Sequence, residues 1–375
     1  MKKQFLLIVA LFLGGTMLNA QPGAHDPSRM TQNTDGRYWV FTTGQGIYAM
    51  SAPSTSFSGS RSEATPFGSS YPSWVKSYVT GFTGFFWAPD VVKYGSKYLL
   101  YYACAGTGAP AAIGVCTATN LAGPWTDYGV VVHGNNAIDP APYWDGTDFY
   151  LAWGNWQSGI DISRISTSTA KLTGSVTHLI SGQVEGPYLM KNGSYWYLFY
   201  QRGLCCNGVN STYYVVVARS SSATGPYSGE RVFLPNKNGR VIGPGHVGYG
   251  CGKLTYHFYD GNDNGNPKLA ITTLSWGSDG WPVAGSYKSG TEIMDDANAN
   301  GSVAVYPNPS NGNFTVSGLK AESTITVMDI QGREVFSSLS GQAEVTDITA
   351  NLKPGSYIVR IENTNGVTIK KLIVE

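Results

Sequence analysis

The stretch that decides the fold is IDPAPYWDGTDFYLAWG, Ile138 to Gly154. An acidic residue and a proline open it, and an apolar, aromatic run follows. The Asp-Gly pair at 145–146 is a strong signal for a tight hairpin turn, and the residues after it again have strand character. This stretch therefore predicts two paired antiparallel strands with an acidic residue at the start of the first.

The same pattern returns four more times along the chain. It is found in HDPSRMTQNTDGRYWVFTTG (25–44), WAPDVVKYGSKYLLYYAC (87–104), VEGPYLMKNGSYWYLFYQ (184–201) and GPGHVGYGCGKLTYHFYD (243–260). The units begin at the anchor residues Asp26, Asp90, Asp139, Glu185 and His246. A four-stranded propeller blade needs roughly 40 to 50 residues, and the distance from one anchor to the next equals or somewhat exceeds that length. No long amphipathic helix interrupts them. The sequence predicts an all-β protein, a five-bladed β-propeller over 21–290.

The innermost strand of every propeller blade lines the central channel. If each unit begins that strand, the five anchor residues all lie at the same end of the channel. Several carboxylates in one cavity repel one another, and at least one pKa must rise. Hydrolysis of a glycosidic bond uses such a pair, because one carboxylic acid protonates the leaving oxygen and one carboxylate activates water. Asp90 is also interpreted as a structural residue that fixes the start of its blade.

The N-terminus and the composition indicate an exported protein. Residues 1–20 read as a signal peptide, with Lys2 and Lys3 before an apolar run and Ala20 at the expected cleavage point. No later stretch is long and apolar enough to predict a membrane span. The net charge of +1 gives no reason to expect a nucleic-acid or membrane-surface partner.

Taken together, HDPSRM, FWAPDV, NAIDPAPYWDG, VEGPYLMKNGSYWYLFY and CCNGVNSTYYVVVARS resemble family 43 glycoside hydrolases, especially the endo-1,5-α-L-arabinanases, over about residues 22–287. The resemblance implies hydrolysis with inversion, with Asp26 as general base, Glu185 as general acid and Asp139 as the residue that orients the acid and tunes its pKa. It also implies that His246 is the axial histidine that commonly binds calcium, largely through water. It implies no organic cofactor.

Aromatic faces and polar side chains near these motifs are the candidates for sugar binding. Trp87 is the first, and the others are Phe86, Asn136, Ser158, Tyr188 and Arg202. The expected substrate is arabinan, cleaved internally. The alternatives are an exo-acting α-L-arabinofuranosidase or β-xylosidase of the same family, and a non-catalytic glycan-binding propeller. Loop shape decides between the enzymes, and the sequence leaves it open.

The five cysteines are an odd number, so at least one has no partner within the chain. Cys104 and Cys116 flank a plausible hairpin, and one interpretation is that they face each other across it. Cys205 and Cys206 are adjacent, and Cys251 stands alone. With so few cysteines in so long a chain, disulfides are not expected to be the main framework of the fold.

The composition changes after the propeller. Residues 291–302 are small and polar and read as a linker. Residues 303–375 alternate β-forming residues with Asn-Gly, Gln-Gly and Pro-Gly turns and predict a small β-sandwich. YPNPSNGNF, DIQGREV and the closing Lys-Lys resemble the C-terminal sorting domain of the type IX secretion system. The resemblance implies export across the outer membrane by that machinery, to a secreted or cell-surface location, and we expect a monomer.

Overall fold

The computed structural model describes residues 23–107, 110–134, 136–285, 303–308, 310–319, 322–329, 333–341, 344–363 and 366–375. The chain divides into two compact units, Met1–Tyr287 and Lys288–Glu375. The predicted signal peptide (1–20) and linker (291–302) lie outside the described residues. Within those residues, none of the helices has the length and apolar character needed to cross a membrane.

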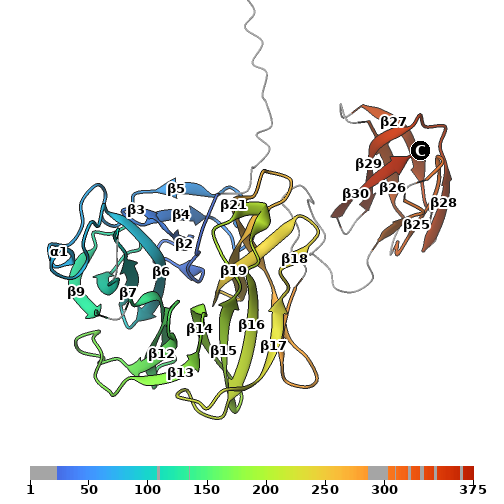
Figure 1. Cartoon of the computed structure of the whole chain (residues 1–375). Coiled ribbons are helices and arrows are strands. Elements are labelled where there is room, and N and C mark those ends of the chain that lie inside the picture. The colour runs from blue at the N-terminus through green and yellow to red at the C-terminus, as the bar shows by residue number, and fades with distance from the viewer. Residues whose placement is uncertain are drawn as a thin grey trace, which may run out of the picture. The chain divides into compact units, whose positions relative to one another are not determined.

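The described part of the larger unit contains five antiparallel sheets arranged as the blades of a propeller (Figure 1). Blade 1 contains β1 (Thr31–Gln32), β2 (Tyr38–Thr42), β4 (Tyr48–Ala52) and β5 (Arg61–Glu63), and blade 2 contains β3 (Gly44–Gln45), β6 (Phe85–Tyr94), β7 (Lys97–Cys104), β8 (Ala112–Ala118) and β9 (Thr126–Val132). Blade 3 contains β10 (Ile138–Trp144), β11 (Phe149–Asn155), β12 (Gly159–Arg164) and β13 (Thr177–Ser181), and blade 4 contains β14 (Glu185–Asn192), β15 (Tyr195–Arg202), β16 (Tyr214–Ser220) and β17 (Ser228–Leu234). Blade 5 contains β18 (Lys237–Asn238), β19 (Val241–Gly250), β20 (Lys253–Asp260) and β21 (Asn266–Thr272).

The described part of this unit also contains helix α1 (Val75–Tyr78), a 3-10 turn at Gly208–Asn210, and a hairpin of β22 (Leu274–Trp276) and β23 (Pro282–Ala284). The fold prediction, an all-β five-bladed propeller, is confirmed.

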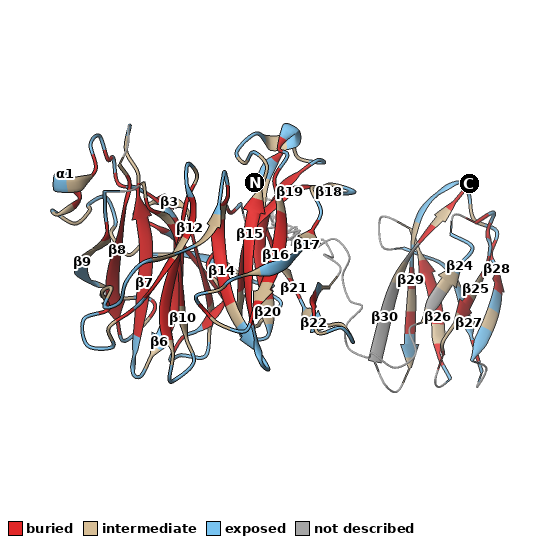
Figure 2. Ribbon diagram, turned by 60° about the horizontal axis from the view of Figure 1, so that its bottom comes forward, coloured by how far each residue is buried: buried red, intermediate tan, exposed pale blue. Residues whose placement is uncertain are grey.

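The core lies between neighbouring blades, and Figure 2 shows the strands buried along most of their length. Successive side chains of a strand point to opposite faces of its sheet. Tyr102 of β7 therefore packs with Trp39 toward blade 1, whereas Tyr101, the residue before it, packs with Leu151 toward blade 3. Because both faces of a blade are covered, the inner strands are almost continuously apolar.

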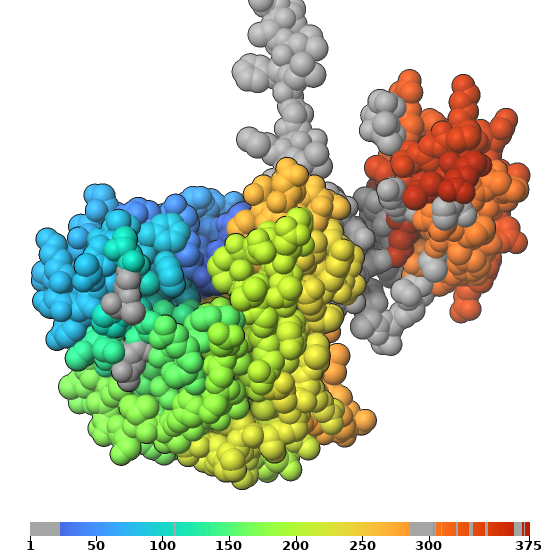
Figure 3. All heavy atoms as spheres, viewed as in Figure 1, coloured from blue at the N-terminus to red at the C-terminus, as the bar shows by residue number. Residues whose placement is uncertain are grey.

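The ring closes between blades 5 and 1, which lie side by side in Figure 3. Met30 and Val40 of blade 1 pack against Leu269 of β21. The segment ahead of blade 1 adds a single antiparallel bridge between Gly23 and Lys268. Among the described residues, closure therefore rests on this packing and on the one bridge.

Each blade begins with the same backbone irregularity. One residue has a positive φ, and in blades 2 to 5 the register between the first two long strands shifts at this point, which marks a β-bulge. The positive-φ residues are Asp26 (48°), Ala88 (42°), Asp139 (55°), Gly186 (59°) and His246 (55°). Bulges of this kind occur next to active sites, where they re-aim a side chain.

The bulges correct the predicted alignment of the units. The residue of blade 2 that matches Asp26 is Ala88, and Asp90 lies two positions further along β6. In blade 4 the matching residue is Gly186, so Glu185 comes one position before it. A count of acidic residues could not reveal this, because the backbone conformation, not the carboxyl group, is what the five units share.

The smaller unit is a β-sandwich of two antiparallel sheets. One contains β24 (Ala304–Tyr306), β25 (Asn313–Ser317) and β28 (Val345–Thr349), and the other contains β26 (Thr324–Met328), β27 (Glu334–Leu339), β29 (Gly355–Asn363) and β30 (Gly366–Val374). Phe314 and Ile348 of the first sheet share a core with Ile325 and Val359 of the second. The predicted sandwich is present, and it has a core of its own.

Candidate active site

Three carboxyl groups from three different blades meet in one hollow of about 530 Å³. Asp26 comes from blade 1, Asp139 from β10 of blade 3 and Glu185 from β14 of blade 4. All three belong to the bulged blade starts, so the repeated backbone irregularity is what brings them together. The hollow is lined by His25, Asp26, Thr43, Phe85, Trp87, Ile138, Asp139, Glu185, Cys205, Cys206, Gly208, Tyr213, Tyr259, Gly265 and Pro267.

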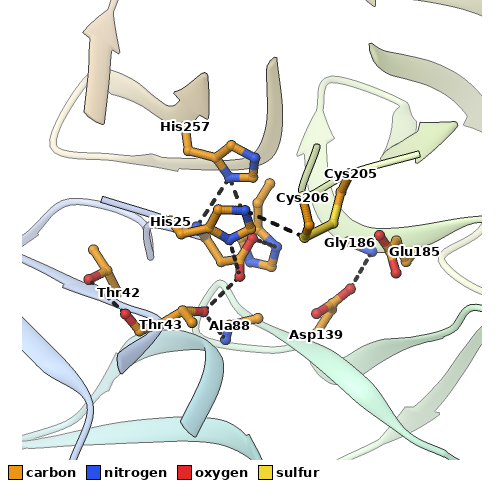
Figure 4. A network of polar contacts seen from close by, with 12 residues as sticks. His25, Thr42, Thr43, Ala88, Asp139, Glu185, Gly186, Cys205, Cys206 and His257 are labelled. Atoms are coloured by element: carbon orange, nitrogen blue, oxygen red, sulfur yellow. Dashed lines mark hydrogen bonds and ion pairs between the residues drawn. A yellow bond between two sulfur atoms is a disulfide. The ribbon is translucent and has the colours of Figure 1, made fainter. Parts of the chain in front are cut away.

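Hydrogen-bond donors and imidazole rings surround Asp26, and Figure 4 labels three of these neighbours, His25, Thr43 and His257. Its Oδ2 lies 2.8 Å from Nδ1 of His25 and accepts a hydrogen bond of 2.7 Å from the hydroxyl of Thr43. Its Oδ1 lies 3.4 Å from Nδ1 of His257 and 3.8 Å from Nδ1 of His246. The contacts of Oδ2 with His25 and Thr43 favour the ionised carboxylate.

The pKa of Asp26 follows from these contacts. Burial alone would raise it, but the charge and hydrogen bond of His25, helped by His246 and His257, outweigh burial and hold the pKa well below its usual value. The pKa of His25 is raised in return: burial has the largest single effect and would lower it, but the charge and hydrogen bond of Asp26, together with the charge of Glu185, outweigh burial. Asp26 is therefore an ionised acceptor, suited to take a proton from water.

Glu185 has the opposite environment. Burial in the hollow is the main cause that raises the pKa of its carboxyl group to about 7, and the negative charge of Asp26 adds to it, although a hydrogen bond of 2.8 Å from the Tyr213 hydroxyl to Oε1 of Glu185 acts against the rise. A carboxyl group with such a pKa holds a proton near neutrality and is able to donate it.

Asp139 lies beside Glu185 and is more deeply buried. Its Oδ2 accepts a hydrogen bond of 2.8 Å from the backbone N–H of Gly186, the residue next to Glu185. Burial and then the charges of Glu185 and Asp26 raise the pKa of Asp139 well above its usual value. The Gly186 contact ties Asp139 to the backbone that carries Glu185.

His246 is buried and lies close to Asp26. Burial lowers its pKa, so the ring is neutral and offers a lone pair. Two groups of metal-binding side chains come together among the described residues, His25 with Cys205 and Cys206, and His25 with Asp26 and His257. His246 is in neither. Its surroundings provide few of the six to eight oxygen ligands that calcium prefers, so a cation here would be held mainly by water.

The predicted sugar-binding residues separate into two groups. Trp87 is 39% exposed and lines the hollow, next to Phe85 on the same strand. Asn136 and Ser158 line a second hollow of about 540 Å³, and Asn136 lies two residues before Ile138, which lines the first. Phe86, Tyr188 and Arg202 do not line either hollow.

Local structure explains why these three lie elsewhere. Phe86 is 0% exposed because it alternates with Phe85 and Trp87 along β6 and faces the core between blades 1 and 2. Tyr188 is 5% exposed, and its hydroxyl donates to the carbonyl of Tyr249. Arg202 pairs with Glu230 across blade 4. The structure therefore does not support sugar contact by these side chains.

Asp90 has the structural role that was one interpretation of it. Its carboxylate accepts hydrogen bonds from the backbone N–H of Arg29 at 2.9 Å and from Nε of the same residue at 3.0 Å. The guanidinium group also donates to the carbonyl of Pro142 and lies 5.1 Å from the ring centre of Tyr188. Arg29 thus joins blades 1 to 4 around the axis.

Several residues of the hollow were missed by sequence reasoning. His25 adjoins Asp26 in the quoted motif, and Tyr213 lies within the quoted CCNGVNSTYYVVVARS, so a signal existed for both. Thr43 and Tyr259 also lie in quoted stretches, near the ends of 25–44 and 243–260, but nothing in the sequence distinguishes them from the strand residues around them. The prediction that Cys104 and Cys116 face each other is wrong: Cys104 pairs with Ala112 and Cys116 with Leu100, and both thiols are free and buried.

Comparison with known proteins agrees with the fold and the site. The profile of glycosyl hydrolases family 43 matches residues 21–282. An extracellular endo-α-(1→5)-L-arabinanase of Bacillus subtilis is 38% identical over 233 residues, covering 56% of this chain and 72% of that protein. An extracellular exo-α-(1→5)-L-arabinofuranosidase of Cellvibrio japonicus is 33% identical over 304 residues, covering 70% of this chain and 86% of that protein.

Solved structures give the same picture. A GH43 endo-arabinanase from Bacillus licheniformis superposes with a TM-score of 0.64 at 33% identity, over 70% of this chain and 97% of that one. An exo-1,5-α-L-arabinanase from a bovine ruminal metagenomic library superposes with a TM-score of 0.65 at 29% identity, over 71% of this chain and 98% of that one.

The profile of the secretion system C-terminal sorting domain matches residues 304–375, which indicates export by type IX secretion. The match to the family 43 profile covers most of the chain. The chain therefore belongs to glycosyl hydrolases family 43 and is a glycoside hydrolase with a C-terminal secretion sorting domain.

Proposed function

We propose that this enzyme cleaves the α-1,5-linked L-arabinofuranosyl chains of arabinan with inversion at the anomeric carbon, as a monomer. The observation that supports this most strongly is the opposite tuning of two carboxyl groups in one hollow. The pKa of Asp26 is held low and that of Glu185 is raised to about 7. Pairs of titratable groups whose surroundings separate their pKa values mark a base and an acid. Relatives named as arabinan-degrading enzymes support the substrate.

In this proposal Glu185 donates its proton to the leaving glycosidic oxygen while Asp26 accepts one from water, whose oxygen attacks the opposite face of the sugar ring. Inverting enzymes hold the two carboxyl groups far enough apart to admit that water. Thr43 and His25 fix the Asp26 carboxylate through Oδ2, which leaves Oδ1 on the side of His246 and His257. Asp139 is the third member, and the hydrogen bond that it accepts from the Gly186 N–H positions the backbone that carries Glu185.

We propose endo action because a second hollow has a lining residue, Asn136, only two positions before Ile138 of the catalytic hollow. Polar groups of Asn136, Asn155, Gln157 and Ser158 line this second hollow. Such groups suit the hydroxyls of further sugar residues, while Trp87 offers an aromatic face beside the acids. Chromatography of products from linear 1,5-arabinan over time tests this. A ladder of oligosaccharides is the expected early product, whereas one short product from the start would indicate exo action.

The axial cation suggested by the resemblance remains a proposal. His246 would supply one nitrogen ligand and water the remainder, and the ion would stabilise the channel in which Asp26 lies. Chelation is expected to lower the melting temperature by about 5–10 °C and calcium to restore it, because a ligand bound only by the folded state stabilises that state. His246→Gln should abolish this calcium dependence. Fewer than about 0.1 metal ions per purified chain, with no shift on adding calcium, would contradict the proposal.

The sorting domain is expected to contribute nothing to catalysis. The candidate catalytic and metal-binding side chains lie between His25 and Tyr259, and the sandwich has its own core. A chain ending at Ala284 should therefore cleave arabinan within about twofold of the full-length rate and melt within about 2 °C of it. Loss of cleavage in the purified shortened protein would show that the C-terminal residues help to close the propeller. In the native host, the same deletion should trap active enzyme in the periplasm.

A further inference from the structure

Cys205 and Cys206 form a disulfide between adjacent residues at the mouth of the catalytic hollow. They lie on the loop between β15 and β16 of blade 4, the blade that also carries Glu185. Cys206 is exposed and Cys205 is half-buried. Figure 4 shows the sulfur pair beside His25, and Sγ of Cys206 lies 3.8 Å from Nε2 of that ring. The disulfide is thus part of the wall next to the reacting groups.

The loop that carries the disulfide is held from both sides. The backbone N–H of Cys206 donates to the hydroxyl of Tyr259 at 2.7 Å, and that hydroxyl shares a hydrogen bond of 2.8 Å with Nε2 of His25. On the other side, the carbonyl of Leu204 accepts hydrogen bonds from the backbone N–H of Thr212 and from the hydroxyl of Ser211. The two sulfurs are therefore presented to the hollow from a fixed backbone.

The same residues do not suit a metal ion, although ligand atoms of His25, Cys205 and Cys206 lie within 4.8 Å of one another. Metals bind the thiolate form of cysteine, and sulfurs bonded to each other carry no thiolate. A disulfide also has no S–H donor. What it offers to the hollow is a compact, polarizable and largely apolar surface.

An apolar surface also faces the hollow from blade 2, where Phe85 and Trp87 are partly exposed. Blades 2 and 4 are not neighbours in the ring, so the aromatic pair and the disulfide bound the hollow from different sides. Asp26, Asp139 and Glu185 lie in the same hollow. A sugar residue whose linkage reaches Glu185 would have the sulfur pair against it.

We propose that the Cys205–Cys206 disulfide is a substrate-contacting wall that determines the affinity for the arabinofuranosyl residue next to the cleaved bond. This rests on the proposed function. Reduction would replace one fixed surface with two separate thiols that rotate independently. The loss of roughly 50 Å² of apolar contact predicts an increase in KM of about tenfold with kcat within about twofold.

The test compares oxidised and phosphine-reduced full-length enzyme on arabino-oligosaccharides, together with the Cys205→Ser/Cys206→Ser double variant. Both reduction and the double substitution should raise KM about tenfold. Cys251→Ser removes an exposed free cysteine and is the matched control. It should show the wild-type KM and the same response to reduction, whereas the double variant should not respond to the phosphine.

A second measurement covers the case in which the double variant folds poorly. Calorimetric titration of arabino-oligosaccharide into the Glu185→Gln enzyme, before and after reduction, should show affinity falling about tenfold. An unchanged KM and affinity would overturn the proposal. A fall in kcat alone would also overturn it, because the loop would then act on Asp26 through Tyr259 and His25. If the untreated wild-type enzyme cleaves no arabinan, it is the proposed function that fails.

Discussion

Glu185→Gln is expected to lower kcat on linear 1,5-arabinan by 10²–10⁴-fold while the protein keeps its fold and binds substrate. Glutamine keeps the size of the side chain, and its amide can still accept the hydrogen bond from Tyr213. What it lacks is a proton that can be transferred to the leaving oxygen. An arabinose hydroxyl is a poor leaving group as an alkoxide, so the loss of the acid acts directly on the step that breaks the bond.

The leaving group distinguishes an acid from a merely structural residue. On a nitrophenyl arabino-oligosaccharide, whose nitrophenolate leaves without protonation, the Glu185→Gln defect should shrink to less than about tenfold. Glu230→Gln is the matched control, because it makes the same change on blade 4 in a partly exposed pair with Arg202, outside both hollows. Its activity should stay within about twofold of wild type. An equal loss on both substrates would contradict the role of Glu185 as acid.

The pH profile gives an independent check on the same residue. Glu185 must be protonated to act, and its pKa is raised to about 7. Activity on arabinan should therefore be retained below that pH and fall as the pH rises through about 7. This basic limb should be absent for the nitrophenyl substrate. A basic limb that is the same for both substrates would mean that another group causes it.

The sequence was sufficient to predict the fold because the repeated unit combines several local signals. An Asp-Gly or Asn-Gly turn between two apolar runs specifies a hairpin, and five hairpins at blade spacing specify a closed ring. Asp26, Asp139 and Glu185 could be predicted from their places in those units. The positive φ at each blade start could not, since the units share it through residues as different as Ala88 and His246.

The errors have two physical sources. Side chains alternate along a strand, so Phe86 faces the core although both of its neighbours on β6 line the hollow. The residues brought in by loops between strands, such as Cys205 and Cys206, depend on loop paths that no periodic pattern encodes. Cys104 and Cys116 were misplaced for a related reason, because the register of β7 and β8 offsets them by four residues.

Asp26→Asn is expected to reduce kcat/KM by 10²–10⁴-fold on every substrate, including those with good leaving groups. An amide cannot accept a proton from the attacking water, and water attack is needed whatever group departs. The two variants should therefore differ on the nitrophenyl substrate. The defect of Glu185→Gln should shrink there, whereas the defect of Asp26→Asn should be as large as on arabinan.

The fold of Asp26→Asn is expected to survive for a reason specific to this site. Residue 26 has a φ of 48°, in the left-handed region, and asparagine is among the few non-glycine residues that adopt it readily. The amide oxygen can still accept the hydrogen bond from Thr43. Asp148→Asn is the matched control, because it makes the same chemical change in a residue that pairs with Arg164 and lines neither hollow. Its activity should stay within about twofold of wild type. If Asp26→Asn kept more than about a tenth of the wild-type rate on arabinan, with Asp148→Asn unaffected, the water would have to be activated by another residue.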